Sequence, residues 1–414
     1  MAAIEGLSTR VAAPRWRARV SASPALVLFM CVFTSQAAVL VLSPILVEVA
    51  RDLDVSTAVA GQVRVFAAPI ALAVAVLVAR SGGRLPLRSL LLVGSALVAV
   101  GSVASAAAPS FVVLALAQVP LWAGVAVLVA GGVGAAGSWT TAEARSRVLA
   151  RALAGAPAAW VVGMPTIGLV AGVSWRLAFV AVPLPAAVVT SVVLLRRGPE
   201  NAAPRPGASL AGLLRQRGVR PWLLGELLAM SSWAGTLVFS GALFVEVYGL
   251  SPRLTGVLLA TIALAYLGGN ALGGHIHHEC LRRALARGNV AAAATVALTW
   301  LITPHVVVTL VLFSVTAVVV GARTVVGTAH GFALAGERRL EVGAARSAIQ
   351  HAGYLVGSFV GGAALALGGY SAIGIAFGLL FLGATAPYLS TWAARCPRPG
   401  ALSLIASRRQ PQSA

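Results

Sequence analysis

Residues 196–220 read RRGPENAAPRPGASLAGLLRQRGVR, and this stretch decides how the rest of the chain is organised. It is polar, basic and contains proline, whereas long apolar runs lie on both sides of it. A segment of this kind in the middle of a 414-residue chain is typical of a linker. We therefore predict two halves of similar length, with a tail at each end. The predicted boundaries are 1–24 for the first tail, 25–195 for the first half, 196–221 for the linker, 222–393 for the second half and 394–414 for the last tail.

The composition on both sides of the linker excludes an ordinary soluble protein. Hydrophobic residues make up 59% of the chain and charged residues only 10%, against about 45–50% and about 25% in soluble domains. So few charged side chains could not cover a surface exposed to water, whereas a surface exposed to lipid tails needs none. We predict an integral membrane protein whose partner is the lipid bilayer.

Twelve apolar runs are long enough to cross a membrane as helices. A transmembrane helix needs about 20 mostly apolar residues to cross about 30 Å of hydrocarbon, and these runs are continuous, unlike the alternating strands of a barrel. The ninth run is short, which leaves its boundary with the tenth open. The predicted spans are 25–49, 58–79, 87–108, 110–136, 148–172, 175–195, 222–248, 254–275, 288–303, 305–335, 345–367 and 370–393. The predicted fold is therefore all-α, with twelve transmembrane helices in two pseudo-symmetric six-helix bundles.

The 31 basic residues are all arginine, and their distribution predicts the orientation of the helices. If the amino terminus is cytoplasmic, 26 of the 31 fall in the termini and the cytoplasmic loops. The exceptions are Arg51, Arg64, Arg176, Arg253 and Arg323. Cytoplasmic loops carry such an excess of positive charge, so we predict a multi-pass protein of the cytoplasmic membrane with both termini inside. The arginines form no basic face with interleaved aromatic residues, so we predict no nucleic-acid partner.

The two predicted halves resemble each other at an offset of 195 residues. The pair VS at 55–56, followed by Gly61, matches the pair LS at 250–251, followed by Gly256. In each half the match lies between the first and the second predicted helix. Duplicated halves are typical of secondary transporters, in which the substrate site lies near the midplane between the repeats.

Features of enzymes and of ATP-driven pumps are weak or missing in the sequence. The stretch HIHHE over 275–279 contains zinc-ligand residue types, but adjacent ligands in one predicted loop do not make a closed site, so we predict no metal. Cys31, Cys280 and Cys396 share no motif spacing and indicate no disulfide. The chain has no phosphate-binding loop and no lysine, which excludes ATP-driven transport by this chain. We predict no cofactor and no enzymatic activity, with a membrane-embedded metal-dependent enzyme as the alternative that HIHHE leaves open.

The best-defined motif is GMPTIG over 163–168, followed by SWRLAF over 174–179. Shorter motifs are LSP over 42–44, GLS over 249–251 and Gly357-x-x-x-Gly361-Gly362. On these residues the chain resembles the major facilitator superfamily, and more narrowly its twelve-helix bacterial efflux branch of arabinose-type and chloramphenicol-type exporters. The resemblance implies a bacterial drug:proton antiporter. It also implies an antiport role for Gly163, Pro165 and Gly168, because glycine and proline let helices approach closely and bend.

The chain departs from the pattern of this family at two places. The loop after the second helix normally carries an acid before Arg, Gly and Arg, whereas residues 79–84 read ARSGGR. The resemblance therefore implies a cytoplasmic latch that is weakened or rebuilt, with Arg84 and Glu143 as its gating residues. The first helix of the family often carries a proton-binding acid, whereas residues 34–36 read TSQ. The first predicted helix thus supplies no titratable group at that position.

Charged residues inside the predicted spans are the first candidates for function, because a charge at a helix centre costs about 2.5–3.5 kcal/mol on insertion scales. Arg323, in the tenth span, either receives an anionic substrate or is the counter-ion of a buried carboxylate. Glu226, in the seventh span, is the first candidate for proton coupling, because a desolvated carboxylate takes up a proton more readily. Glu48 and Glu246, near outer helix ends, are further candidates, or else exposed charges that pair with nearby arginines.

Uncharged polar residues inside the spans are candidates for the substrate cavity. Gln36, Tyr266 and Asn270 either line this cavity together with Arg323 or form interhelical hydrogen bonds. Arg64 lies about two turns from the outer boundary of the second span. It is either an interfacial residue whose side chain reaches water or part of the outer gate.

These features favour a secondary active transporter that exports a small drug-like or metabolite molecule by alternating access, in exchange for protons. The main alternative is a facilitator or importer of sugars or other metabolites without proton coupling. A membrane receptor or scaffold is disfavoured, because no soluble segment is long enough to form a signalling domain. The expected partners are a small-molecule substrate and protons, and the expected state is a monomer.

Overall fold

The structure is a computed structural model of the whole chain. It describes residues 24–80, 86–139, 148, 151–152, 154–197, 210–276, 281–335 and 339–391. Within these ranges the regular elements are all helices, which confirms the predicted all-α fold. Nearly all of both predicted tails, residues 198–209 of the linker, Arg84, Glu143 and positions 277–279 of HIHHE lie outside the described residues.

The first half contains six membrane-length segments, three of which are divided into two helices. The first span is broken at Val41, because Pro44 has no N–H to donate to the carbonyl of Leu40. The helices of this half are α1 (Pro24–Leu40), α2 (Leu42–Asp52), α3 (Thr57–Gly61), α4 (Val63–Arg80), α5 (Leu87–Ala106), α6 (Phe111–Trp139), α8 (Gly155–Ala171), α9 (Trp175–Ala181) and α10 (Pro183–Arg197).

The second half contains longer, mostly unbroken helices. The exception is the last one, in which Gly368 and Gly369 have non-helical backbone angles. Gly369 has a φ of +66°, which glycine adopts without strain. The helices of this half are α11 (Leu210–Leu214), α12 (Val219–Tyr248), α13 (Pro252–Gly273), α14 (Leu281–Leu301), α15 (Val306–Ala335), α16 (Arg339–Gly383) and the short 3₁₀ helix η3 (Ala386–Thr391).

The helices are long and apolar enough to form twelve membrane spans. Ten segments of the described chain meet this criterion by length and composition. α8, an apolar helix of 17 residues, is only slightly shorter. The last of the ten segments, Glu341–Gly383, contains two spans separated by the break at Gly368 and Gly369. The predicted fold, twelve helices in two groups of six, is therefore confirmed.

The ninth span is longer than the sequence predicts, and its predicted start at 288 is wrong. α14 begins at Leu281 and has 21 residues. Three arginines between 282 and 287 lower the hydropathy of its first turns. The opposite face of the same turns is apolar, and Leu281 and Leu285 are buried beside Tyr388. The helix therefore starts as an amphipathic segment, which an apolar-run criterion truncates.

The internal repeat marks equivalent turns in the two halves. The Ser56 hydroxyl accepts a hydrogen bond from the N–H of Val59 at the start of α3. The Ser251 hydroxyl accepts one from the N–H of Leu254 at the start of α13. Both serines are thus helix N-caps, and both matched glycines, Gly61 and Gly256, follow one turn later in close helix contacts.

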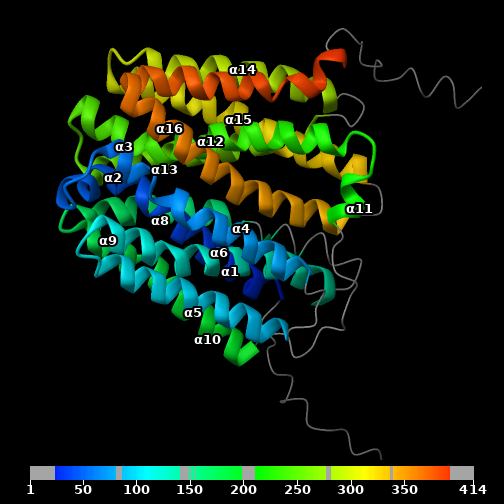
Figure 1. Cartoon of the computed structure of the whole chain (residues 1–414), viewed down its shortest axis with the longest axis horizontal. Coiled ribbons are helices and arrows are strands. Elements are labelled where there is room, and N and C mark those ends of the chain that lie inside the picture. Colours follow the sequence, from blue (N-terminus) through cyan, green and yellow to red (C-terminus); the bar gives the residue numbers. More distant parts are fainter. Residues whose placement is uncertain are drawn as a thin grey trace, which may run out of the picture.

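The two halves lie side by side with their helices running in the same general direction (Figure 1). α5, α6 and α10 lie in the lower part of that view, and α14 and α15 lie in the upper part. Contacts between the halves join α8 to α13, α2 to α12, and α3 and α4 to α16. We call this set of contacts the half–half interface.

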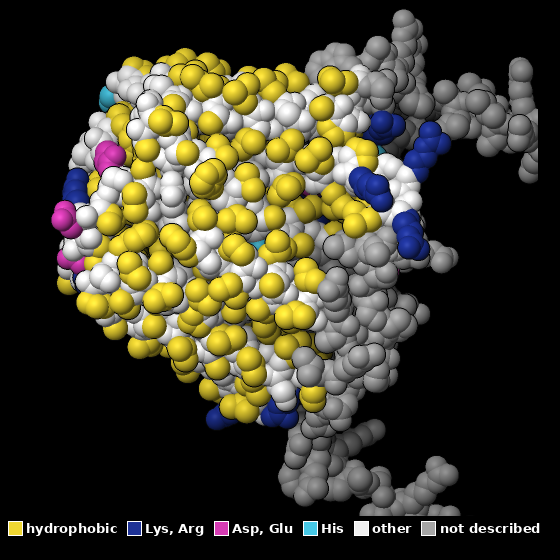
Figure 2. All heavy atoms as spheres, viewed as in Figure 1, with side chains coloured by type: hydrophobic (Ala, Val, Ile, Leu, Met, Phe, Trp, Pro, Cys, Tyr) yellow, Lys and Arg dark blue, Asp and Glu magenta, His cyan; other side chains and the backbone are white. Residues whose placement is uncertain are grey.

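The surface of the molecule is an apolar belt between two polar ends. Figure 2 shows hydrophobic side chains over most of the visible face, with charged side chains concentrated at its margins. Large apolar side chains such as Val112, Leu116 and Leu195 are exposed in this belt, as expected for a surface covered by lipid. We call one end the arginine-rich end, defined by Arg196, Arg217, Arg220, Arg282 and Arg287. The opposite end is defined by Asp52, Arg176, Glu246 and Arg253.

Candidate functional site

The half–half interface is closed toward the opposite end by contacts between α2 and α12. The Ser43 hydroxyl donates to the carbonyl oxygen of Leu237 and lies 3.2 Å from the hydroxyl of Ser240. A Cβ atom built on Gly241 would overlap the carbonyl oxygen of Ser43. The two backbones therefore meet at a point where only glycine fits.

Glu246 forms a second link between the halves at the opposite end. Its side chain is exposed, and its carboxylate accepts hydrogen bonds from Thr57 of α3 and, at 2.8 Å, from Tyr370 of α16. Glu246 is a predicted proton-coupling candidate, and the structure places it at the molecular surface. Its partners are hydroxyl groups rather than the nearby Arg253.

The GMPTIG motif lies in α8 and brings Gly168 into the half–half interface. A Cβ atom on Gly168 would lie 2.5 Å from the carbonyl oxygen of Pro252 and 3.1 Å from the Cα atom of Gly256. In turn, a Cβ atom on Gly256 would lie 2.5 Å from the carbonyl oxygen of Met164. The backbones of α8 and α13 are therefore in direct contact at two glycines, one from each half.

The other two residues of this motif do not face the same contact. A Cβ atom on Gly163 would meet only Val182, at 3.8 Å, so Gly163 has more room. Pro165 lies inside α8, where it removes one backbone hydrogen bond. The structure thus brings one of the three predicted motif residues into direct contact with the second half.

A stack of three aromatic rings crosses the interface. Tyr266 of α13 lies between Trp160 of α8, with ring centroids 5.8 Å apart, and Trp233 of α12, at 5.5 Å with the planes 10° apart. The Trp160 indole N–H donates to the Oε1 atom of Gln36 in α1 at 3.3 Å. Gln36 and Tyr266, both predicted cavity residues, therefore belong to one cluster built from the two halves. Flat apolar faces with a few polar groups are typical of ligand sites.

A buried ionic network joins four helices of the second half. Glu226 of α12 is 2% exposed, and its Oε1 atom lies 2.7 Å from the Nη2 atom of Arg323 in α15. Its Oε2 atom accepts a hydrogen bond from the Nη1 atom of Arg346 in α16 at 2.8 Å. Arg323 also donates from Nε to the Oδ1 atom of Asn289 in α14 at 2.8 Å. Of the two roles expected for Arg323, this geometry is that of a counter-ion to a buried carboxylate.

Glycine makes room for the carboxylate in this network. A Cβ atom on Gly327 would overlap the Glu226 carboxylate, so the side chain lies directly against the backbone of α15. The Trp222 indole N–H donates to the carbonyl oxygen of Gly327 at 3.0 Å and fixes the same contact. The position of Glu226 is therefore determined by close helix packing as well as by charge.

Arg64 has a different environment from Arg323. It is 3% exposed, and its Nη2 atom donates to the carbonyl oxygen of Val39 in α1 at 2.5 Å. Its guanidinium carbon lies 5.6 Å from the ring centroid of Trp122 in α6 and 5.0 Å from that of Tyr354 in α16. We call Trp122 and Tyr354 the aromatic cage of Arg64. The side chain thus points into the protein and lies at the interface of both halves.

Two further predicted residues have buried polar atoms with no partner. The Oδ1 atom of Asn270 in α13 and the Oε2 atom of Glu48 in α2 are both buried, and neither has a hydrogen-bond partner within the described part of the chain. Unsatisfied acceptors of this kind are rare in membrane interiors. Arg84 and Glu143, the predicted latch residues, lie outside the described residues.

Sequence reasoning did not identify several residues of these clusters. Arg346 is the second residue of the predicted span 345–367, whereas α16 begins at Arg339 and places Arg346 about two turns inside the helix. Asn289 is the second residue of the predicted span 288–303, whereas in the structure it lies about two turns inside α14. Trp122 and Tyr354 carried no distinguishing signal, because aromatic residues are common in apolar helices.

The SWRLAF motif joins helix ends within the first half through an ion pair and hydrogen bonds. Asp52, at the end of α2, pairs with Arg176 and accepts a hydrogen bond from the indole N–H of Trp175 at 3.0 Å. Arg176 also donates to the carbonyl oxygen of Ala108 at 3.1 Å. The motif therefore ties the ends of three spans together at the opposite end.

Replacing Asp52 with asparagine is expected to reduce the free energy of unfolding by no more than about 1 kcal/mol, because exposed ion pairs contribute little. The Arg176 and Asp52 side chains are 36% and 45% exposed, and asparagine can still accept from Trp175. The measurement is the thermal unfolding midpoint of the purified protein, with Asp54→Asn as the matched control. Asp54 is exposed and has a φ of +52°, which asparagine tolerates. A loss of unfolding free energy well above that of the control and above about 1 kcal/mol would contradict the interpretation that this exposed ion pair contributes little to stability.

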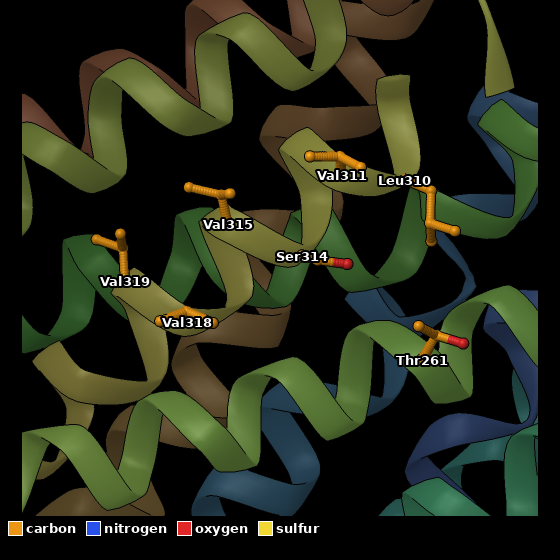
Figure 3. A pocket seen from close by; sticks show the side chains of 7 residues that line it. All are labelled: Thr261, Leu310, Val311, Ser314, Val315, Val318 and Val319. Carbon is orange, nitrogen blue, oxygen red and sulfur yellow. The ribbon is translucent and has the colours of Figure 1, made fainter. Parts of the chain in front are cut away.

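The structure also contains an open apolar groove between α13 and α15. Figure 3 shows its lining, in which the only polar side chains are Thr261 and Ser314. Thr261 is already bonded to the carbonyl oxygen of Val257. The remaining lining residues are Leu310, Val311, Val315, Val318 and Val319. Without a charged or strongly polar group to orient a ligand, this groove is not the candidate site.

No cluster of metal-ligand side chains is found among the residues that the structure describes. His275, the first residue of HIHHE, lies just after α13, and its Nδ1 atom contacts the carbonyl oxygen of Ala271 at 2.9 Å. This contact is a local one at a helix end.

Three solved structures share the fold of this chain. A bacterial homologue of the human lysosomal transporter Spinster, in an inward-facing and unoccupied conformation, gives a TM-score of 0.68 at 15% identity, with 93% of this chain and 96% of that chain covered. Its inward-facing, occupied form gives 0.65 at 16% identity, with the same coverage. The human organic anion transporter MFSD10 (TETRAN) gives 0.63 at 19% identity, with 88% and 98% covered.

No match to a curated protein sequence was found. The family model described as Major Facilitator Superfamily matches residues 28–336, which is most of the chain. This match includes the first half from residue 28 onward and α12 to α15 of the second. With the twelve-span architecture and its interface between two halves, it shows that the chain belongs to the major facilitator superfamily and is a membrane transporter.

Proposed function

We propose that the protein exports a small molecule from the cytoplasm in exchange for protons. In this proposal the arginine-rich end faces the cytoplasm of a bacterium, because an excess of arginine marks the cytoplasmic side of a membrane protein. The opposite end then faces outward, and the contacts at Ser43, Gly168 and Glu246 represent the closed outer side. The protein works as a monomer, as each chain contains both halves of the interface.

The observation that carries the proposal is the carboxylate of Glu226, buried between Arg323 and Arg346. Paired with two guanidinium groups, this carboxylate is stable in its ionised form. If a change in helix packing moves the arginines away, the same burial strongly favours the protonated form. Glu226 would therefore bind a proton in one conformation and release it in the other, which is the requirement for coupling.

The closed contacts are suited to repeated opening. They consist mainly of glycine backbones in van der Waals contact and a few hydroxyl hydrogen bonds, as at Gly241 and Gly256. Such contacts store little energy per pair, so the halves could separate without breaking a strong ionic bond. Arg84 and Glu143 remain the predicted gating residues on the cytoplasmic side.

The direction of transport and the drug-like substrate rest on the resemblance of GMPTIG to the antiporter motif. An uncoupled facilitator is the second candidate, and a specific observation favours it. In α1 the hydroxyl of Thr34 is bonded to Thr190, and Gln36 is bonded to Trp160, and this helix contains no carboxylate. Coupling must then depend on a carboxylate outside α1, and Glu226 of α12 is the first candidate.

Accumulation of antibiotics and dyes in cells that lack their own pumps tests these two functions. Expression of the protein should lower accumulation, and a protonophore should restore it, because the protonophore removes the proton gradient that drives export. Unchanged accumulation across the panel would favour the facilitator or a narrow substrate, because an uncoupled facilitator only equilibrates its substrate and does not lower its accumulation. A panel of anionic, neutral and cationic probes is needed, because the substrate class is not assumed.

A further inference from the structure

Arg64 differs from the other membrane arginines in its lack of a counter-ion. Arg323 and Arg346 both contact Glu226. Arg64 is buried, yet none of the acidic side chains in the described ranges lies within ion-pair distance of it. Its hydrogen bond to the Val39 carbonyl oxygen uses one of the five N–H donors that a guanidinium carries. A buried charge in this position is therefore only partly compensated.

The aromatic cage compensates part of this charge. Trp122 and Tyr354 present ring faces at 5.6 Å and 5.0 Å from the guanidinium carbon, and the two rings are 5.4 Å apart. Cation–π contacts stabilise a desolvated cation, but more weakly than a carboxylate does in the same surroundings. The cage can hold Arg64 in the membrane interior while leaving it able to bind an anion.

A second unsatisfied polar group lies beside the cage. His351 of α16 precedes Tyr354 by one turn, is 1% exposed, and has its ring centroid 6.0 Å from that of Trp122. Neither of its ring nitrogens has a hydrogen-bond partner in the described chain. Such a group is uncommon in a buried site unless a ligand or water completes it. Arg64 and His351 therefore both offer hydrogen-bond donors beside Trp122.

The cage lies next to the aromatic stack of the half–half interface. Val39, which accepts from Arg64, is three residues after Gln36, which accepts from Trp160. Residues three apart lie within one helical turn, about 4.5 Å apart along the axis. The charged cage and the flat stack of Trp160, Tyr266 and Trp233 thus contact the same turn of α1. A molecule with an anionic group and an aromatic body would contact both.

We propose that Arg64 is the anion-binding residue of the transport site and that the transported molecule is an amphipathic organic monoanion, such as an aromatic carboxylate. This inference rests on the proposed transport function and names the substrate class of the same interface. A carboxylate accepts two parallel N–H bonds from one guanidinium, and a single guanidinium balances a single negative charge. A cation is disfavoured, because Arg64 and Arg323 outnumber Glu226 among the fully buried charges of the described residues.

Binding of a matched set of probes to the purified full-length protein tests the proposal. The probes are 2-naphthylacetate, 2-naphthylacetamide and 2-(2-naphthyl)ethylamine, which share one ring system and differ in charge. We expect the carboxylate to bind at least about tenfold more tightly than the amide, and the amine to bind most weakly. The measurement is isothermal titration calorimetry. Equal affinity for the carboxylate and the amide, or tighter binding of the amine, would overturn the proposal.

The variant Arg64→Gln should remove the tenfold preference and leave the affinity for the amide unchanged. Arg253→Gln is the matched control, because Arg253 is exposed at the opposite end and should keep the preference. If Arg64→Gln does not fold, Arg64→Lys takes its place. Loss of the bidentate geometry should then weaken carboxylate binding by at least about threefold, without an effect on the amide.

A purely structural role for Arg64 predicts a different result. If Arg64 only caps the end of α1 at Val39, its replacement lowers the unfolding temperature but leaves the ratio of carboxylate to amide affinity unchanged, and that result would overturn the proposal. Flux into everted vesicles separates this failure from a failure of the transport function. Gradient-driven flux of neutral probes alone would refute anion selectivity and support the transport function. Carboxylate binding without any flux would support anion selectivity and refute the transport function.

Discussion

Replacing Glu226 with glutamine is expected to abolish the effect of a pH gradient on transport. Glutamine has the shape of glutamate but cannot ionise, so it cannot carry a proton between the two conformations. The measurement is substrate flux in proteoliposomes with and without an imposed pH gradient. In the native protein the gradient should accelerate flux. In the variant the two rates should be equal, and any remaining flux should be uncoupled exchange down the substrate gradient.

The same substitution is expected to reduce stability strongly. It leaves Arg323 and Arg346 without a negative partner, and Arg323 is only 4% exposed in its side chain. Removal of one partner of a buried ion pair typically costs about 3–5 kcal/mol. Arg323 keeps its hydrogen bond to Asn289, which places the expected loss toward the lower end of this range. The unfolding midpoint of the purified variant measures this loss, and flux is then compared per folded molecule.

Two control variants distinguish the loss of any charged side chain from the loss of proton coupling at Glu226. Glu246→Gln removes a carboxylate that is exposed and bonded to hydroxyl groups, so it should leave the response to the pH gradient intact. Arg346→Gln removes the partly exposed partner of Glu226 and keeps the buried pair with Arg323. This second variant should fold more stably than Glu226→Gln. A full response to the pH gradient in Glu226→Gln would exclude Glu226 as the proton site.

Much of the fold could be predicted because a membrane span depends on local composition. Continuous apolar runs place most helices within a few residues of their observed ends, as for α5, which begins at 87 as predicted. The criterion failed where a span starts as an amphipathic segment. The first turns of α14, which begin at Leu281, contain three arginines on a helix whose Leu281 and Leu285 are buried. Hydropathy averages over the faces of a helix and therefore misses such starts.

The contacts within the site could not be predicted because they depend on how helices pack. Glu226 and Arg323 both stood out as charges in apolar segments, yet 97 positions separate them in the chain. No pattern in either segment indicates that α12 and α15 meet at Gly327. The same reasoning applies to Arg64, whose long side chain could reach water or the protein interior. Its observed direction depends on the Val39 carbonyl acceptor and on the rings of Trp122 and Tyr354, which come from three other helices.

The second large effect is expected for Gly241→Ala, which should prevent closure of the half–half interface at the opposite end. The new methyl group would overlap the carbonyl oxygen of Ser43. Neither the methyl carbon nor this oxygen can move away without a shift of its whole helix. Overpacking of this kind typically costs about 1–3 kcal/mol. Since the cost falls on the closed conformation only, the ratio of open to closed molecules should rise by roughly 5–150-fold.

A cysteine probe measures this shift. The native residues Cys31, Cys280 and Cys396 are first replaced by serine, and Ser240→Cys then introduces a thiol in the closed contact between α2 and α12, where Ser240 is fully buried. Addition of Gly241→Ala should increase the rate of labelling by a membrane-impermeant maleimide and reduce transport. Both effects should occur together, because alternating access requires the closed state as well as the open one.

The matched control is Gly268→Ala, the same substitution at an exposed helical glycine of α13. A Cβ atom on Gly268 would meet nothing within 4 Å, so this variant should leave labelling and transport unchanged and stabilise the helix slightly. The comparison isolates the close contact from the general effect of replacing glycine in a helix. If Gly241→Ala behaves like Gly268→Ala, the contact at Ser43 is not needed for the transport cycle. Closure at this end would then have to depend on Gly168, Gly256 and the hydrogen bonds of Glu246.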